Sequence, residues 1–175
     1  FYGPPGTGKT MAAQVLANEL GLDLYRIDIS QMISKYIGET QKNISELFDK
    51  AKDSNALLFF DEADAFFAKR TEISDSNDRN ANAEVAHLLQ KLEGYEGISI
   101  LATNLNENID NAFKRRIKYM VRFQLPDKAT RRLFWNKMLP PQAPVEEGLE
   151  LEYFADHFEI SGSEIKECMF HAAYM

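Results

Sequence analysis

Close to its beginning the chain carries the octapeptide Gly3-Pro-Pro-Gly-Thr-Gly-Lys-Thr10, which fits the pattern G-x-x-x-x-G-K-[ST]. Its three glycines let the backbone curl so that successive N–H groups point into one concavity and hold an anion. Lys9 can then reach the β- and γ-phosphates of a nucleotide, and the Thr10 hydroxyl can ligate Mg²⁺. The neighbouring segments suit this role, because residues 1–2 read as the end of a strand and residues 11–20 as a helix. The octapeptide predicts nucleotide contacts from Pro5, Gly6, Thr7, Gly8, Lys9, Thr10 and Met11.

Composition narrows the class of protein. The 175 residues are 45% hydrophobic and 27% charged, which is ordinary for a soluble globular chain. No apolar run approaches the roughly 20 residues of a membrane span. Cys168 is the only cysteine, which excludes an intramolecular disulfide and fits a reducing cytoplasm. The formal charge of −7 argues against nonspecific binding of nucleic acid, so nucleic acid is not an expected partner.

Both ends of the chain are abrupt. Only two residues precede the octapeptide, whereas a phosphate-binding loop usually follows a complete strand. Residues 171–175 end inside an apparent helix that has no stop signal. We therefore expect the chain to be a piece of a longer polypeptide.

Strand and helix patterns alternate along the first three quarters of the chain. Alternation of this kind predicts βαβ units, and hence an α/β fold with a mainly parallel sheet sandwiched by helices. The polar stretch 70–82 reads as a loop. After Pro126 only helical patterns follow, so we expect an α/β domain over residues 1–126 and a small helical lid domain over 127–175, each lacking a part. The expected strands are 24–29, 57–60, 98–102 and 119–123, and the expected later helices are 83–92, 129–138, 149–157 and 163–174.

Acidic residues follow the apolar run 57–60, which has the character of a strand buried on both faces. Such a strand delivers Asp61 and Glu62 to the carboxyl edge of a parallel sheet, where ligands bind. Asp61 would hold Mg²⁺ through water, and Glu62 would orient and deprotonate the water that attacks the γ-phosphate. The alternative is that these acids only cap a following helix. Asp64 is expected to cap or to form an ion pair.

Two further elements lie later in the chain. Asn104 ends the expected strand 98–102 and could place an amide beside the γ-phosphate, although asparagine at a strand end is commonly a turn former. Arg115 and Arg116 could form a solvated basic face, or could present guanidinium groups to the γ-phosphate of a neighbouring subunit.

Taken in order, the octapeptide, Phe59-Phe-Asp-Glu62, Ala102-Thr-Asn104 and Phe113-Lys-Arg-Arg116 resemble the AAA+ ATPases, and more narrowly the AAA clade that contains spastin, katanin and the proteasomal ATPases. The resemblance implies that Asn104 is the first sensor residue and that Arg115 and Arg116 act in trans. It implies ATP and Mg²⁺ as cofactors, a P-loop NTPase fold and a homo-oligomeric ring, usually a hexamer.

The resemblance also implies a function for the segment Lys35-Tyr-Ile-Gly38. In the clade a Lys-aromatic-x-Gly loop at this place lines the central pore and grips an extended polypeptide. Tyr36 is a rigid amphipathic side chain that suits this role, with Ile37 as its companion, and Gly38 permits a tight turn. The alternative is a surface tyrosine that only packs locally.

In the helical region, Ile160-Ser-Gly-Ser-Glu-Ile165 resembles the start of the clade's third lid helix, where Gly162 would let the backbone approach the adenine. A helix N-cap by Ser161 or Ser163 explains the same residues, and both can hold. The stretch around residues 79–97 is similar to a bacterial branch of AAA ATPases associated with contractile injection systems. His87 within it is expected to serve packing.

Together these features predict a ring ATPase that remodels or threads protein substrates. Its expected partner is a protein substrate or an adaptor. A nucleic-acid-dependent loader and a nucleotide-gated scaffold are the alternatives. The acidic composition and the segment 35–38, with its aromatic Tyr36, argue against the loader.

Overall fold

The computed structural model divides into two compact units. The sheet unit comprises Phe1–Tyr2 and Lys9–Arg122, and the helical unit comprises Gly3–Gly8 and Phe123–Met175. Among the described helices none is both long and apolar enough to cross a membrane. The structure describes residues 1–29, 39–52, 54–64, 76–104, 114–146 and 148–174, with residues 76–82 described by their backbone.

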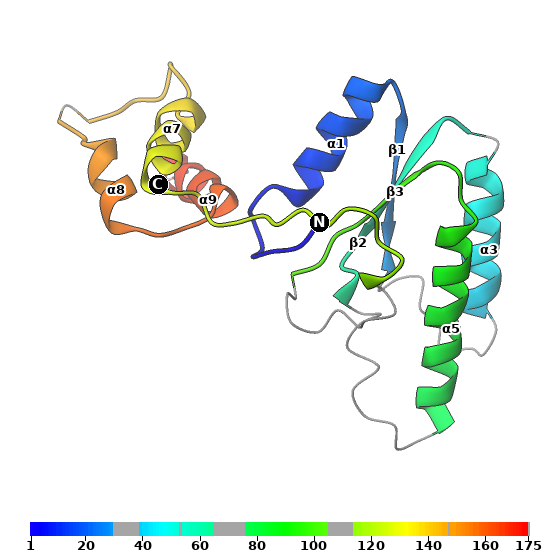
Figure 1. Cartoon of the computed structure of the whole chain (residues 1–175). Helices are drawn as coiled ribbons and strands as arrows, with labels where there is room; N and C mark the ends of the chain where they lie inside the picture. The colour runs from blue at the N-terminus through cyan, green and yellow to red at the C-terminus, as the bar shows by residue number, and fades with distance from the viewer. Residues whose placement is uncertain (30–38, 53, 65–75, 105–113, 147, 175) are drawn as a thin grey trace. The chain divides into compact units, whose positions relative to one another are not determined.

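The sheet is parallel, as the alternating pattern predicts. Its strands are β1 (Asp23–Asp28), β2 (Ala56–Asp61) and β3 (Ile98–Leu101), in the order β1-β2-β3 (Figure 1). Tyr2 adds isolated parallel bridges to Thr103 and to Arg122. Because the strands are parallel, their carboxyl ends lie at one edge of the sheet, which is where the candidate site lies.

Residues 119–123 do not form the predicted strand. Only Arg122 pairs, through its bridge to Tyr2, and the Tyr2 amide donates to Val121 O at 3.0 Å. A strand needs a partner along its length, and the segment beside these residues consists of Phe1 and Tyr2. The strand-forming residue types in 119–123 are therefore not sufficient to produce a strand.

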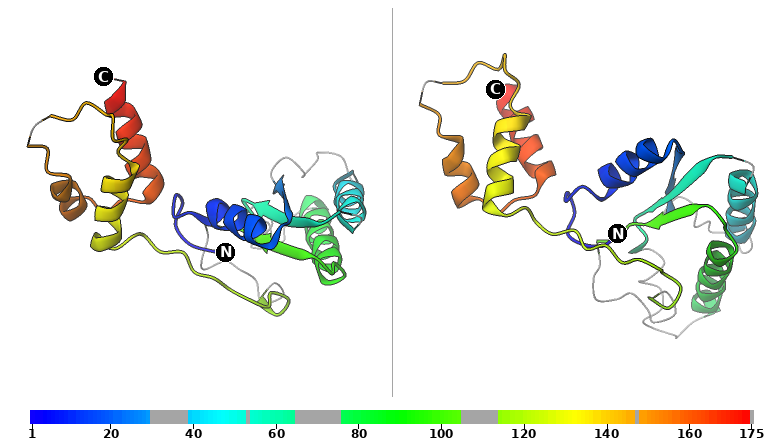
Figure 2. Two further views of the ribbon diagram at one scale, coloured as in Figure 1. Left: turned by 90° about the horizontal axis from the view of Figure 1, so that it is seen from above. Right: turned by 45° about the horizontal axis from the view of Figure 1, so that its top comes forward.

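Among the described residues, three helices cover the two faces of the sheet: α1 (Lys9–Leu20), α3 (Glu39–Lys52) and α5 (Ser76–Glu93). Helix α1 packs on one face, and α3 and α5 pack on the other (Figures 1 and 2). Because strand side chains alternate, odd-numbered β2 residues face α1 and even-numbered ones face α3 and α5. The α1 face buries Ala13, Ala17, Leu57, Phe59, Ile100 and Ala102, and the opposite face buries Ile27, Ile44, Phe48, Leu58, Phe60, Val85 and Leu88.

The prediction of a loop over residues 70–82 was wrong for residues 76–82, which belong to α5. The buried side chains of Val85, Leu88 and Leu89 anchor this helix to the core. Once a helix is anchored, each added residue gains a hydrogen bond without the cost of nucleating a new helix. Within residues 76–82, Arg79 and Ala81 have high helix propensity, which favours that extension.

The helical unit contains α7 (Lys128–Met138), α8 (Leu151–His157) and α9 (Gly162–Ala173), close to the ranges expected from the sequence (Figure 2). Asp127 caps α7 by accepting from Thr130 N at 2.8 Å. Arg131 is buried among these helices and donates to Ala155 O at 3.0 Å and to Pro126 O at 2.9 Å. The core of the unit is formed by Trp135, Ala155 and Ile165.

Helix α9 begins with a capping box at Ser161. The Ser161 hydroxyl accepts from Glu164 N at 3.4 Å, and a Glu164 carboxylate oxygen accepts from Ser161 N at 2.8 Å and from its hydroxyl at 2.6 Å. Of the two serines that the sequence offered as caps, the structure selects Ser161. Hydrogen bonds from the Ser161 side chain, and then from its backbone, lower the pKa of Glu164 from its ordinary value of 4.5.

Replacing Ser161 by alanine is expected to lower the free energy of unfolding at neutral pH by about 1 kcal/mol, because the Glu164 N–H loses its acceptor and the Glu164 carboxylate loses the bond from the Ser161 hydroxyl. A carboxyl whose folded pKa is lowered stabilises the fold above its unfolded pKa, and this contribution is lost as the pH falls through the folded pKa. The difference between wild type and Ser161→Ala should therefore shrink below the ordinary Glu164 pKa of 4.5. Urea unfolding at pH 7 and pH 3 measures this. An equal difference at both pH values would contradict the assigned role of Glu164.

Candidate functional site

The carboxyl end of β2 carries the first candidate residue. Asp61 is the last residue of the strand and shares the α1-facing side with Phe59. Its Oδ2 lies 3.4 Å from the Thr10 hydroxyl, near the start of α1. The same Oδ2 accepts from Arg26 Nη2 at 2.7 Å. The strand alternation thus brings together the two residues that the sequence proposes as metal ligands.

Glu62 has a special backbone conformation. Its φ of 54° makes it the one non-glycine residue with a positive φ in the described part of the chain. A bulky residue in this region costs roughly 1–3 kcal/mol and persists where the surroundings impose it. Its N–H donates to Asp61 Oδ1 at 3.1 Å, and its side chain is exposed. The chain therefore turns sharply after β2 and presents the Glu62 carboxylate at the edge of the sheet.

Lys9 is buried, with 8% of its surface exposed, and its Nζ donates to Asn104 Oδ1 at 2.8 Å. Burial lowers the pKa of Lys9, and the nearby Asp64 and Asp61 carboxylates partly oppose this effect. The side chains of Lys9 and Asn104 are therefore in direct contact, although the two residues are 95 positions apart in the chain. A desolvated ammonium group of this kind is suited to bind phosphate.

Asp64 has a role that sequence reasoning missed. Its Oδ1 accepts from Asn104 N at 3.1 Å and also from the Thr103 hydroxyl. One residue earlier, Ala63 N donates to Ala102 O at 2.9 Å. These bonds fix the segment after β2 to the end of β3 and so position Asn104. The only signal in the sequence was the spacing of Asp64 three residues after Asp61, which does not name a partner.

All three glycines of the octapeptide have backbone angles that favour glycine: φ is +140° at Gly3, +70° at Gly6 and +97° at Gly8. Within the helical unit, Gly6 O accepts from Ser163 N at 3.3 Å. A Cβ on Gly6 would lie 1.9 Å from the Ser163 hydroxyl oxygen and 2.5 Å from that of Ser161. The Thr7 hydroxyl donates to Pro4 O at 2.8 Å and closes the turn. The loop thus packs directly on the start of α9.

Gly162 has a packing reason for being glycine. A Cβ at this position would lie 3.1 Å from the Phe134 ring of α7, tighter than an ordinary contact. The absence of a side chain therefore lets α7 and α9 approach closely. The predicted role of Gly162 beside adenine stays a prediction.

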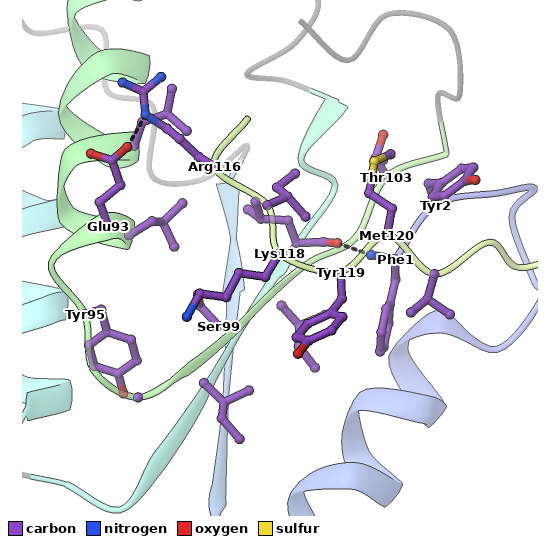
Figure 3. Close-up of a pocket in the computed structure, with 18 of the residues that line it drawn as sticks. Phe1, Tyr2, Glu93, Tyr95, Ser99, Thr103, Arg116, Lys118, Tyr119 and Met120 are labelled. Atoms are coloured by element: carbon purple, nitrogen blue, oxygen red, sulfur yellow. Dashed lines mark hydrogen bonds and ion pairs between the residues drawn. The ribbon is translucent and has the colours of Figure 1, made fainter. Parts of the chain in front are cut away.

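Arg115 and Arg116 are both exposed, but the structure distinguishes them. Arg116 Nε forms an ion pair with Glu93 at the end of α5 (Figure 3). This pair lies beside an apolar cavity of about 620 Å³, lined by Phe1, Leu89, Leu92, Ile98, Ile117 and Tyr119 among others. The cavity lining includes neither Lys9 nor Asp61 nor Glu62, so the cavity is separate from the residues with phosphate chemistry.

Lys35, Tyr36, Ile37 and Gly38 lie outside the described residues, as do residues 105–113 before the arginine pair. Their proposed roles stay predictions. His87, expected to serve packing, lies on α5 with its Nε2 2.9 Å from the Ser45 hydroxyl of α3.

The residues around Asp61 fit a nucleotide-bound magnesium ion. Mg²⁺ takes oxygen ligands and is usually held by one or two carboxylates together with substrate phosphates. Asp61 and Thr10 supply one carboxylate and one hydroxyl side by side. In the described part of the chain no group of three or more His, Cys, Asp or Glu side chains could hold a metal by itself. The donor set therefore suits a metal that arrives with its phosphates.

The chain matches the model of the family described as "ATPase family associated with various cellular activities (AAA)" over residues 1–125. It is 35% identical to a proteasome-activating nucleotidase of Saccharolobus solfataricus, an alignment that covers all of this chain and 46% of the relative. It is 36% identical to a 26S proteasome regulatory subunit 4 homologue of Arabidopsis thaliana, over 95% of this chain and 39% of the relative.

An uncharacterized AAA family ATPase of Sinorhizobium fredii is 40% identical over 74% of this chain and 39% of its own length. The chain thus spans less than half the length of these relatives. The family match extends from the octapeptide through the end of the sheet unit, and it includes every residue that carries the geometry around Asp61. With its parallel sheet and its similarity to proteasomal ATPases, the chain belongs to the AAA family of ATPases.

Proposed function

We propose that this chain binds and hydrolyses ATP with Mg²⁺ in a homo-oligomeric ring, and that the ring remodels or threads protein substrates. The observation that carries the proposal is the convergence of Lys9, Asp61, Glu62 and Asn104 at the carboxyl edge of one parallel sheet. These residues supply a cation, a metal ligand, a base and an amide, which are the groups that phosphoryl transfer to water needs.

Each residue has a task that follows from its position. Lys9 would bind the β- and γ-phosphates. The hydrogen bond from Lys9 Nζ to Asn104 would keep the lysine ammonium group at the edge of the sheet. Glu62 would accept a proton from the attacking water, because it is exposed beside Asp61. Asp64 would hold Asn104 in place. Bound Mg²⁺ would neutralise charge on the phosphates.

The proposal of a ring rests on the arginine pair and on the relatives. Arg115 and Arg116 are exposed, and exposed guanidinium groups can reach the γ-phosphate of an adjacent subunit. Two of the relatives are named for the proteasome. We extend to this chain a hexameric ring, a protein substrate or adaptor, and a pore contact by Tyr36 with Lys35, Ile37 and Gly38. The acidic charge of −7 supports protein rather than nucleic acid as the substrate.

Mixed rings test this proposal. Subunits with Arg115→Ala and subunits with Lys9→Ala should each lose most of their ATP turnover as pure rings. A 1:1 mixture should recover about a quarter of wild-type turnover, since that share of sites pairs an intact Lys9 with an intact neighbouring Arg115. Phosphate release by the assembled full-length protein measures this. No recovery in the mixture would contradict action in trans.

Arg116→Ala is the informative companion variant, because Arg116 is already paired with Glu93 of its own chain. If Arg115 is the group that reaches the neighbour, Arg116→Ala should reduce turnover less than Arg115→Ala does. A larger loss of turnover in Arg116→Ala than in Arg115→Ala would show that the ion pair between Arg116 and Glu93 opens in the ring.

A further inference from the structure

We propose that Arg26 is a counter-ion for Asp61 that competes with the divalent cation. In this interpretation the guanidinium group neutralises the Asp61 carboxylate while no cation is bound, and cation binding requires the pair to separate. The inference rests on the proposed function, because it takes Asp61 as the metal-binding carboxylate. Arg26 lies on β1 and belongs neither to the octapeptide pattern nor to the acidic pair Asp61-Glu62.

The register of the sheet brings the two groups together. Arg26 pairs with Phe59, and Asp28 pairs with Asp61. Side chains at paired positions of a parallel sheet project from the same face, and residues two apart on one strand share a face. Arg26 and Asp61 therefore lie diagonally across adjacent strands on the face that α1 covers. Their closest atoms, Nη2 and Oδ2, are 2.7 Å apart.

The oxygen that Arg26 contacts is the one nearest the other metal-ligand candidate. Asp61 Oδ2 faces both Arg26 Nη2 at 2.7 Å and the Thr10 hydroxyl at 3.4 Å. A magnesium ion shared by Thr10 and Asp61 would compete for this same oxygen. Two cations at one carboxylate oxygen repel each other, and the repulsion is strong because Asp61 is only 17% exposed. The guanidinium group and the divalent cation are therefore alternative partners of Asp61.

The exposure of the two partners makes exchange feasible. The Arg26 side chain is 63% exposed, so it can turn into solvent without leaving a buried charge unpaired. An ion pair of this exposure contributes little to folding stability. Its larger effect is expected on the charge at the site, because the neighbouring strand also places Asp28 opposite Asp61. Arg26 offsets the repulsion between these acidic groups when no divalent cation is present.

The test compares cation affinity in wild type, Arg26→Ala and Arg26→Lys, all in the full-length protein. Mn²⁺ serves as the probe, and its free concentration is measured by electron paramagnetic resonance with a non-hydrolysable ATP analogue equimolar to the protein. A protein-free titration gives the Mn²⁺ that the analogue binds by itself. The matched control is Lys42→Ala, which removes one positive charge from an exposed ion pair with Glu46 on α3. Unfolding midpoints of all variants are recorded in parallel.

Arg26→Ala is expected to lower the Mn²⁺ dissociation constant about threefold or more, because a competitor for Asp61 is gone. Arg26→Lys should fall between wild type and Arg26→Ala, and it carries the test if Arg26→Ala unfolds. Lys42→Ala should bind Mn²⁺ as wild type does.

Unchanged or weaker Mn²⁺ binding in both Arg26 variants would overturn the inference alone. Weaker binding would show that Arg26 orients Asp61 for the cation or binds phosphate itself. Mn²⁺ binding no tighter than that of the analogue alone in every variant, wild type included, would overturn the proposed function and the inference with it. The two failures are therefore distinguishable.

Discussion

Glu62→Gln is expected to leave ATP bound and to lower its hydrolysis by roughly 100-fold or more, the usual contribution of a positioned general base. Glutamine keeps the size and hydrogen-bonding reach of glutamate but cannot accept a proton at neutral pH. The backbone at Glu62, with φ at 54°, is unchanged by this substitution, so the position of the side chain is retained. Phosphate release gives turnover, and a fluorescent ATP analogue gives affinity in the same preparation.

The matched control is Glu19→Gln, which removes one carboxylate from an exposed position on α1. It should have wild-type turnover and affinity. Undiminished turnover in Glu62→Gln would exclude Glu62 as the base and would leave Asp61 or Asp64 as the nearest carboxylates. Loss of ATP binding together with turnover would instead show that Glu62 is needed to build the site.

Lys9→Met is expected to weaken ATP binding by about 10- to 100-fold, the range for loss of a charge-assisted contact. The folded protein itself should not lose stability. Burial lowers the pKa of Lys9, which means that its charge is disfavoured in the folded state. For a base with a lowered folded pKa, stability rises as the pH increases from the folded toward the unfolded pKa. A neutral side chain of similar length removes that penalty.

Titration with a fluorescent ATP analogue measures the affinity, and urea unfolding without nucleotide measures the stability. Lys50→Met, on the exposed surface of α3, is the control for loss of one lysine charge. The assignment fails if Lys9→Met binds ATP as wild type does. If affinity and stability fall together, then the main role of Lys9 is its bond to Asn104 rather than to phosphate.

Much of the fold followed from local patterns. The apolar run 57–60 became the buried part of β2, and helices α7, α8 and α9 lie near the ranges that their apolar spacing predicted. The predictions failed where the secondary structure of a segment depends on the segments that it packs or pairs with. Residues 119–123 have strand-forming composition but pair only at Arg122, and residues 76–82 are polar yet continue an anchored helix.

The sequence by itself determined the chemical groups of this protein. The octapeptide identifies Lys9 and Thr10, and the acidic pair that follows the apolar run 57–60 identifies Asp61 and Glu62, because in both cases the chemistry is encoded within a few consecutive residues. Tertiary structure decided which of these groups meet. Lys9 and Asn104 are 95 residues apart in the chain, Asp64 and Asn104 are 40 apart, and Arg26 and Asp61 are 35 apart. Their contacts depend on strand order and register, which are set by the packing of both sheet faces rather than by any local pattern.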